Sequence, residues 1–173
     1  MLKDLPKPAS VNKRGIPQAP FLENIDEYCA SKEDATHLLQ VLSQQTHKYQ
    51  YMELNTKERM KSLLAKIPEV ESSLSMAKFL LERTEFETLY ELNDTVYTTA
   101  KVPPTETVML WLGAGTMLEY KVEEAIELLT EKLSEANQSL DSCREDVEFL
   151  RECVTTMEVN TARVVNWRIE KGN

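Results

Sequence analysis

The chain has 173 residues and carries a net charge of −9 at pH 7, which argues against nucleic acid as a main partner. No apolar run in it approaches the roughly 18 to 20 residues that a membrane-spanning helix needs. With 28% charged residues, 7% aromatic residues and only 4 Gly, the composition fits long solvated helices better than a loop-rich globule. The length suits one domain, or one subunit that borrows part of its core from partners.

The first 20 residues hold four of the seven prolines and show no hydrophobic period, so we predict a flexible N-terminal arm over residues 1–20. A short amphipathic piece follows, with apolar residues at helical spacing: Phe21, Leu22, Ile25, Tyr28 and Cys29. Ser31 or Asp34 can cap the helix that comes next. This piece and the first long helix form the predicted region 21–83.

The first long helix is predicted from about Thr36 to Arg83. Its seam is Leu38, Leu42, Gln45, Tyr49, Met52 and Thr56, then, after a stutter, Met60, Leu63, Ile67, Val70, Leu74, Ala77 and Leu81. Pro68 removes one backbone donor, so we expect a kink or a short break there. The seam continues on both sides of the proline, which favours a kink.

Residues 84–120 change to short β-prone runs separated by turn residues, and they predict two β-hairpins. The first joins LYEL to TVYTTAKV through Asn93-Asp94, and the second joins VMLWL to TMLEY through Gly113-Ala114-Gly115. The VMLWL strand is apolar on both faces. Four short strands carried by one helix pair cannot cover both faces, so we expect other subunits to cover them.

The second long helix is predicted over residues 121–170. Apolar or small residues recur in it at spacings of three and four: Ile126, Leu129, Leu133, Ala136, Leu140, Cys143, Val147, Leu150, Val154, Met157, Thr161 and Val164. Residues 119–152 hold eleven acidic against four basic residues, whereas residues 38–83 hold seven basic against five acidic ones. Matched length and opposite charge excess predict that the two helices pair within one chain.

The predicted fold is therefore mostly α with a small β insert: a long antiparallel two-helix coiled coil with two β-hairpins at its base. The residues where the two helices would end together include apolar side chains off the strict seam. End-packing of the coiled coil explains Val164 and Leu38. A surface that grips another protein is the alternative for the remaining candidates, which we take as Phe21, Leu22, Leu39, Val165 and Trp167.

No catalytic, metal or cofactor site is predicted. His37 and His47 lack acidic or thiol neighbours at ligand spacing. The three cysteines, Cys29, Cys143 and Cys153, form no CxxC pair and have no adjacent base, so they predict neither a disulfide framework nor a nucleophile. We expect a non-enzymatic protein of the cytoplasm.

Several long segments resemble α-class subunits of the prefoldin family. These are RGIPQAPF at 14–21, KYQYME at 48–53, IPEV at 67–70, ELNDTVYTTAKVPPTETVMLWLGAGTMLEY at 91–120, EEAIELL at 123–129, EDVEFLRE at 145–152 and TTMEVNTARVVNW at 155–167. Their order and separation fit the family over most of residues 14–167.

The resemblance implies an ATP-independent co-chaperone that acts as a heterohexamer of two α-class and four β-class prefoldin subunits. Such complexes hold unfolded actin and tubulin between coiled-coil tips and pass them to the cytosolic chaperonin. On that basis we expect the subunit-assembly residues to be Val108, Leu110, Trp111, Leu112, Met117 and Leu118. The alternative is a structural or tethering coiled coil that dimerises through its second helix and has no client grip.

Overall fold

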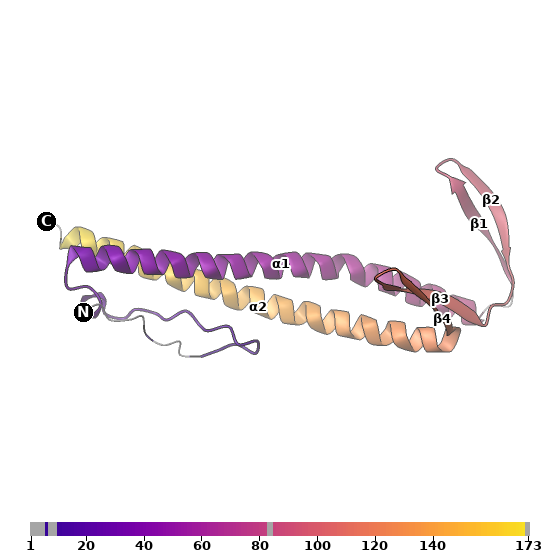
Figure 1. The fold of residues 1–173 in the computed structure, drawn as a ribbon, viewed down its shortest axis with the longest axis horizontal. Helices are drawn as coiled ribbons and strands as arrows, with labels where there is room; N and C mark the ends of the chain where they lie inside the picture. Colours follow the sequence, from indigo (N-terminus) through magenta and orange to yellow (C-terminus); the bar gives the residue numbers. More distant parts are fainter. Residues whose placement is uncertain (1–5, 7–9, 83–84, 172–173) are drawn as a thin grey trace. The chain divides into compact units, whose positions relative to one another are not determined.

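The computed structural model describes residue 6, residues 10–82 and residues 85–171. The elements in chain order are the 3-10 helix η1 (Ile25–Glu27), helix α1 (Lys32–Glu82), strands β1 (Phe86–Asn93), β2 (Val96–Val102), β3 (Thr107–Gly113) and β4 (Thr116–Lys121), and helix α2 (Val122–Glu170), as Figure 1 shows. Two long helices with two inserted β-hairpins confirm the predicted fold class and element order.

Helix α1 begins with a reciprocal cap. The backbone N–H of Asp34 donates to the Ser31 hydroxyl at 3.2 Å, and the Asp34 carboxylate accepts from the backbone N–H of Ser31 at 3.1 Å. Both residues that the sequence offered as caps therefore act together, because each satisfies a backbone donor that the first helical turn leaves unpaired. The helix starts at Lys32, four residues before the predicted start.

Helix α1 passes through Pro68 without a break. A proline inside a helix costs about 3 kcal/mol, because it removes one hydrogen bond and crowds the preceding turn. Ile67 before it and Leu74 after it are buried, so packing on both sides of the proline offsets that cost. At the end of the helix the predicted seam is wrong by one residue: Leu81 is 54% exposed, and Leu80, three residues after Ala77, is half-buried instead.

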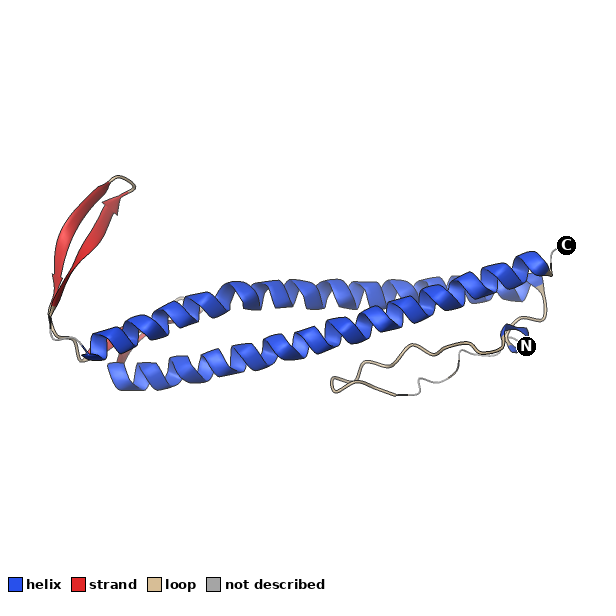
Figure 2. Ribbon diagram, turned by 180° about the vertical axis from the view of Figure 1, so that it is seen from behind, coloured by secondary structure: helices blue, strands red, loops and turns tan. Residues whose placement is uncertain are grey.

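The chain divides into two compact units through which both helices pass. Unit 1 is Met1–Ser62 with Leu140–Asn173, and unit 2 is Leu63–Ser139. In unit 1 the beginning of α1 and the end of α2 lie side by side and run in opposite directions (Figures 1 and 2). The core between them contains Leu38, Leu42 and Tyr49 from α1, and Leu150, Met157 and Val164 from α2.

Unit 2 has a smaller core. Leu74 and Ala77 of α1 pack with Leu129 of α2, and Val70, Ile126, Leu133 and Leu110 of β3 are packed around them. Leu110 therefore connects the second hairpin to the helix pair. Every predicted seam residue of α2 is buried or half-buried across the two units, which confirms that this seam is filled from within the same chain.

The four strands form two separate two-stranded antiparallel sheets, β1–β2 and β3–β4. In the first, Leu89 pairs with Thr99; in the second, Trp111 pairs with Met117. The β3–β4 turn places Gly113, Ala114 and Gly115 at positive φ. Glycine adopts this conformation without steric cost, whereas Ala114, at φ 51°, is strained there.

The segment before α1 differs from the predicted amphipathic helix. Only Ile25–Glu27 forms a single 3-10 turn, and residues 10–24, which turn around residues 12–16, form neither helix nor strand and run beside the helices of unit 1 (Figure 2). Pro17 and Pro20 lack a backbone N–H, and their carbonyls accept hydrogen bonds from side chains of the helices, Tyr49 and Asn160. Residues 1–5 and 7–9 of the predicted arm lie outside the described residues, and its flexibility stays a prediction.

Candidate functional site

The β-hairpins of unit 2 form the first candidate binding surface. On β3 and β4 the side chains of Trp111, Leu112, Met117 and Leu118 are exposed, Trp111 by 62%. Val108 and Leu110 are half-buried, and Leu110 packs on the helix cluster. The structure thus brings the six predicted assembly residues together on one hairpin and leaves four of them largely open to solvent.

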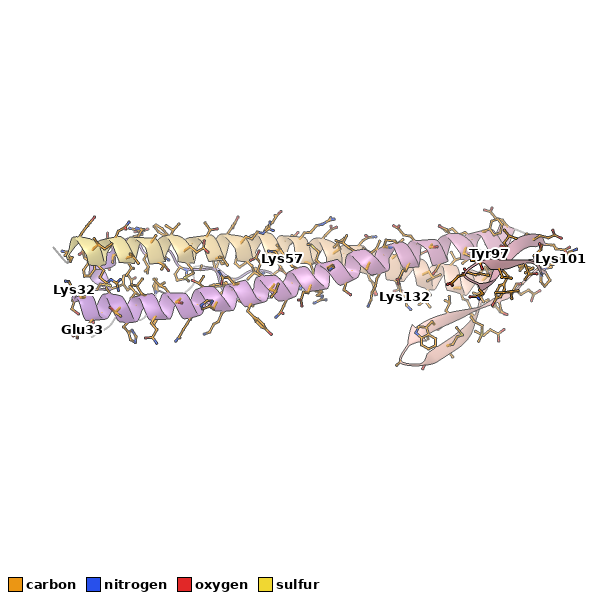
Figure 3. All side chains as sticks on the ribbon, turned by 90° about the horizontal axis from the view of Figure 1, so that it is seen from above. Lys32, Glu33, Lys57, Tyr97, Lys101 and Lys132 are labelled. Carbon is orange, nitrogen blue, oxygen red and sulfur yellow. The ribbon has the colours of Figure 1, made fainter. Side chains whose placement is uncertain are left out.

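The first hairpin, β1–β2, is equally apolar and was absent from the predicted assembly residues. Leu89, Tyr90 and Leu92 on β1 and Val96 and Tyr97 on β2 are exposed (Tyr97 is labelled in Figure 3). None of the described residues in this hairpin is buried. The signal was present in the sequence, because LYEL and TVYTTAKV carry the same aromatic and β-branched types as VMLWL.

An isolated two-stranded sheet is marginally stable in water, and its open edges and apolar faces favour pairing with other chains. The exposed side chains belong to adjacent strands and lie on both faces of their ribbons. We refer to the exposed apolar residues of β1–β4 as the hairpin surface. Its chemistry suits a permanent interface, in which partner side chains complete the core that this chain lacks.

The second candidate surface lies in unit 1, where α1 begins and α2 ends. Of the residues predicted to grip another protein, Phe21 is 52% exposed, and Leu39, Val165 and Trp167 are half-buried. Leu22 is 1% exposed and belongs to the core, so its side chain is not available at the surface. Ile169, two residues after Trp167 on the same helix, is 60% exposed. We call Phe21, Leu39, Val165, Trp167 and Ile169 the helix-end surface.

Residues 10–24, which we call the strap, cover a stripe of α2 that sequence reasoning missed. The stripe consists of Asp146, Cys153 and Asn160, which the strap contacts, and Trp167, which contacts Asp26 just after the strap; each lies seven residues after the one before. It runs beside the apolar seam, and its first three members are buried although two of them are polar. The signal in the sequence was the heptad spacing of these residues next to the seam, but the sequence does not show that the polar ones are buried.

Asn160 is the central contact of the strap. Its side-chain oxygen accepts from the backbone N–H of Leu22 at 3.0 Å, and its amide donates to the Pro20 carbonyl at 2.8 Å. Asn160 is 0% exposed, so both bonds form away from water. They satisfy a side chain whose burial would otherwise be costly, and they hold the strap extended.

Other contacts of the strap also involve its main chain. The backbone N–H of Ala19 approaches the Cys153 sulfur at 3.4 Å, and the Tyr49 hydroxyl donates to the Pro17 carbonyl at 3.0 Å. The Arg163 guanidinium donates to the carbonyls of Leu22 and Glu23, the latter at 2.8 Å. The same guanidinium lies 4.8 Å above the Phe21 ring, within cation–π range.

The far end of the strap is held by charge. Asp146 accepts from the Asn12 amide at 2.9 Å and pairs with Arg14 at 3.0 Å. Asn12 also accepts from the backbone N–H groups of Arg14 and Ile16, which closes a turn around Gly15 at φ 83°. These bonds fix the point where the strap turns back on itself.

At the other end, the Trp167 indole N–H donates to the Asp26 carboxylate at 2.8 Å. This bond, assisted by Lys171 at 3.6 Å, holds the pKa of Asp26 below its ordinary value. Burial raises the pKa of Cys153 and of Cys29, so both thiols stay protonated at neutral pH. All three cysteines are free and buried, and the chemistry of the region is that of packing and binding.

Among the residues that the structure describes, no helix is long and apolar enough to cross a bilayer. Nor do three or more His, Cys, Asp or Glu side chains gather there in a way that would hold a metal ion.

Comparison with known proteins identifies the class to which these features belong. A family model described as "Prefoldin subunit" matches residues 49–167, which include most of α1, both hairpins and most of α2. The chain belongs to this family of co-chaperone subunits, and such subunits assemble with other prefoldin subunits. The hairpin surface is the part of the chain whose exposure fits that assembly.

Within the family, the chain is similar to proteins named prefoldin subunit 3. It is 49% identical to "Prefoldin subunit 3" of Elsinoe fawcettii, over 94% of this chain and 85% of that protein. It is 47% identical to "Probable prefoldin subunit 3" of Schizosaccharomyces pombe, over 93% and 95%, and 43% identical to "Prefoldin subunit 3" of Homo sapiens, over 92% and 84%.

The fold is also that of a solved prefoldin. A chain of "filamentous PFD" from Methanocaldococcus jannaschii matches with a TM-score of 0.54 and 17% identity, over 65% of this chain and 94% of that one. At this identity the likeness concerns the fold alone. It agrees with two long helices joined through two hairpins.

Proposed function

We propose that the chain is an α-class subunit of a cytosolic prefoldin heterohexamer, made of two α-class and four β-class subunits, that captures unfolded actin and tubulin. Capture needs no ATP and no catalytic group. The held chain is then passed to the cytosolic chaperonin. The single observation that carries the proposal is that this chain, which belongs to the prefoldin family, exposes apolar side chains on all four strands of its hairpins.

Assembly follows from the cost of that exposure. Burying apolar surface stabilises by about 25 cal/mol per Å², and a large exposed aromatic such as Trp111 or Tyr97 gains most from cover by a partner. The alternative, a tether that dimerises through its second helix, is disfavoured because the seam of α2 is already packed against α1 in both units.

Client capture is assigned to the helix-end surface. An unfolded chain offers scattered apolar side chains, which a partly exposed aromatic and aliphatic cluster binds without demanding one sequence. Phe21 and Ile169 are the most accessible members, and Trp167 is held in place by Asp26 and by the core beneath it. Leu22 drops out of this set because it is buried.

The test uses the chain assembled with its β-class partners and chemically denatured actin, without nucleotide. We expect the wild-type complex to suppress actin aggregation, measured by light scattering. Phe21→Ser with Ile169→Ser should weaken suppression at least threefold while the complex keeps its mass. The predicted pair Val165→Asp and Trp167→Ala should weaken it as well, with some loss of stability because Trp167 contacts the core.

The matched control is Tyr51→Ser, which removes an exposed aromatic from α1 in the same unit but away from the helix ends. Suppression should be unchanged in this variant. Equal loss in Tyr51→Ser and in the helix-end variant would assign capture to general surface hydrophobicity. Unchanged suppression in the helix-end variants would remove these residues from the client site.

A further inference from the structure

The polar contacts that hold residues 17–23 of the strap are made to its main chain, whereas residues 12–14 are held through their side chains. Asn160, Arg163, Tyr49 and Cys153 bond to backbone N–H or carbonyl groups of residues 17–23. Such bonds do not depend on the side chains of the bound segment. A surface built in this way recognises an extended backbone and tolerates many sequences.

Only two strap side chains between Pro17 and Asn24 are buried, Ala19 and Leu22. Gln18, Phe21, Glu23 and Asn24 are exposed. We call the surface that these residues occupy the seat; it is formed by Tyr49, Cys153, Asn160 and Arg163. The seat therefore selects one small residue and, three positions later, one leucine-sized residue. It places little steric demand on the positions of Gln18, Phe21, Glu23 and Asn24, whereas Pro20 and Ile16 are half-buried.

We propose that the seat of the strap is a binding site for an extended polypeptide segment and that the strap is its internal occupant. The inference rests on the proposed capture of unfolded chains, whose segments are the ligand. In the resting chain the strap covers the seat. A segment of an unfolded chain that carries a small residue and a leucine at the right spacing replaces it.

The strap has the features of a displaceable occupant. Its residues 10–24 form no helix or strand, and the Val11–Pro17 bridge is an isolated pair. Its ion pair Lys13–Glu145 is exposed and contributes little. Because the strap is tethered, its effective concentration is in the millimolar range for a short linker, so a client competes only when many of its segments are held nearby.

The test locks the strap to its seat. The Ala19 backbone nitrogen lies 3.4 Å from the Cys153 sulfur, so Ala19→Cys places a second thiol beside Cys153. The probe is a fluorescein-labelled peptide of residues 14–24, RGIPQAPFLEN, followed by anisotropy on the assembled complex. We expect the oxidised variant to bind it at least tenfold more weakly than the same variant after reduction. Ala162→Cys, an exposed position on α2, is the control and should show no redox effect.

A second variant should change the affinity for the peptide in the opposite direction. Leu22→Asp in the full chain weakens the strap but leaves the seat intact, so the wild-type peptide should bind at least tenfold more tightly than to the wild-type complex. Far-UV circular dichroism checks that the helices persist. The peptide with Leu22→Asp should lose binding at least tenfold, whereas the peptide with Gln18→Ala, an exposed position, should change less than twofold.

Equal peptide binding by the oxidised and reduced Ala19→Cys complex, or no binding by either, overturns the inference. Suppression of actin aggregation is measured on the same samples. Suppression that is present and equal in both redox states refutes the strap inference and leaves the proposed function standing. Absence of suppression in both states refutes the proposed function, while the peptide measurement still decides whether the seat accepts an extended segment.

Discussion

Unit 1 completes its own core, whereas the hairpins of unit 2 leave theirs open. In unit 1 the strap covers a second stripe of α2, and buried polar side chains such as Asn160 find partners within the same chain. In unit 2 the hairpin surface exposes aromatic and aliphatic side chains on every strand. The two regions therefore differ in the source of their cover: unit 1 supplies its own, and under the proposed assembly partner subunits supply that of the hairpin surface.

The largest predicted difference between the two regions is in the loss of stability when one leucine in each is replaced by alanine. Leu150 is 0% exposed, so Leu150→Ala should lower the free energy of unfolding of the purified chain by about 3 kcal/mol through lost burial and a cavity. Leu89 is 71% exposed, and Leu89→Ala should change it by less than about 0.5 kcal/mol. Urea unfolding followed by helical circular dichroism measures both. Similar losses in the two variants would contradict the contrast between the regions.

The strap gives the next largest effect. Asn160→Ala removes two hydrogen bonds and leaves the Leu22 N–H and the Pro20 carbonyl without their partner, which should cost about 2 kcal/mol in the same assay. The matched control is Asn166→Ala, an exposed asparagine on the same helix, with an expected change within about 0.5 kcal/mol. If Asn160→Ala behaves like the control, the strap does not depend on this contact.

The contact between the strap and the stripe on α2 could not be predicted from the sequence. The α2 seam and both hairpins follow from spacings of three, four and two, which depend on neighbouring residues. Asn160 and Leu22 are 138 residues apart, and a side chain that bonds to backbone leaves no periodic trace at the other partner. For that reason Leu22 was predicted at the surface, although it is buried, and Asn160 was overlooked.

The exposed residues of the hairpin surface were easier to predict from the sequence than those of the helix-end surface. Exposed aromatic residues on strands are visible as such in the sequence, and only the choice of Trp111 over Tyr97 was arbitrary. Whether Trp167 points to solvent or to Asp26 depends on a residue 141 positions away.

A smaller effect concerns Glu53 in unit 1, which pairs with Lys57 on the same helix and with Arg151 on α2. The Lys57 ammonium at 2.5 Å, with Arg151 at 3.2 Å, holds the pKa of Glu53 below its ordinary value. A lowered folded-state pKa gives stabilisation that is present above the ordinary glutamate pKa of about 4.3 and is lost as the pH falls through the folded-state value. Glu53→Gln should therefore cost about 1 kcal/mol at pH 7.

That cost should shrink toward zero as the pH falls below the ordinary glutamate pKa of about 4.3 and through the lower folded-state pKa of Glu53. Urea unfolding of wild type and Glu53→Gln at several pH values measures it. A cost that stays constant across these pH values would mean that the carboxylate charge contributes nothing to the pairing.

The smallest predicted effect is a gain in stability from a substitution in unit 2. Ala114 has φ 51° in the β3–β4 turn and is followed by Gly115. Ala114→Asn produces the Asn-Gly pair that such two-residue turns favour, and it should stabilise the chain by about 0.5 kcal/mol. Ala114→Val should lower the stability of the chain, because a β-branched side chain fits a positive φ poorly. A loss of stability in Ala114→Asn would contradict the assigned turn.

The most direct test of the central claim is amide hydrogen exchange, measured on the chain alone and after assembly with β-class prefoldin subunits. If the hairpin surface is completed by partners, amides of residues 86–121 should exchange at least tenfold more slowly in the complex, while those of residues 140–164 stay within about twofold, since a tenfold change corresponds to about 1.4 kcal/mol of added protection. Unchanged exchange in the hairpins, together with slowing along α2, would contradict the account and favour a coiled coil that dimerises through its second helix.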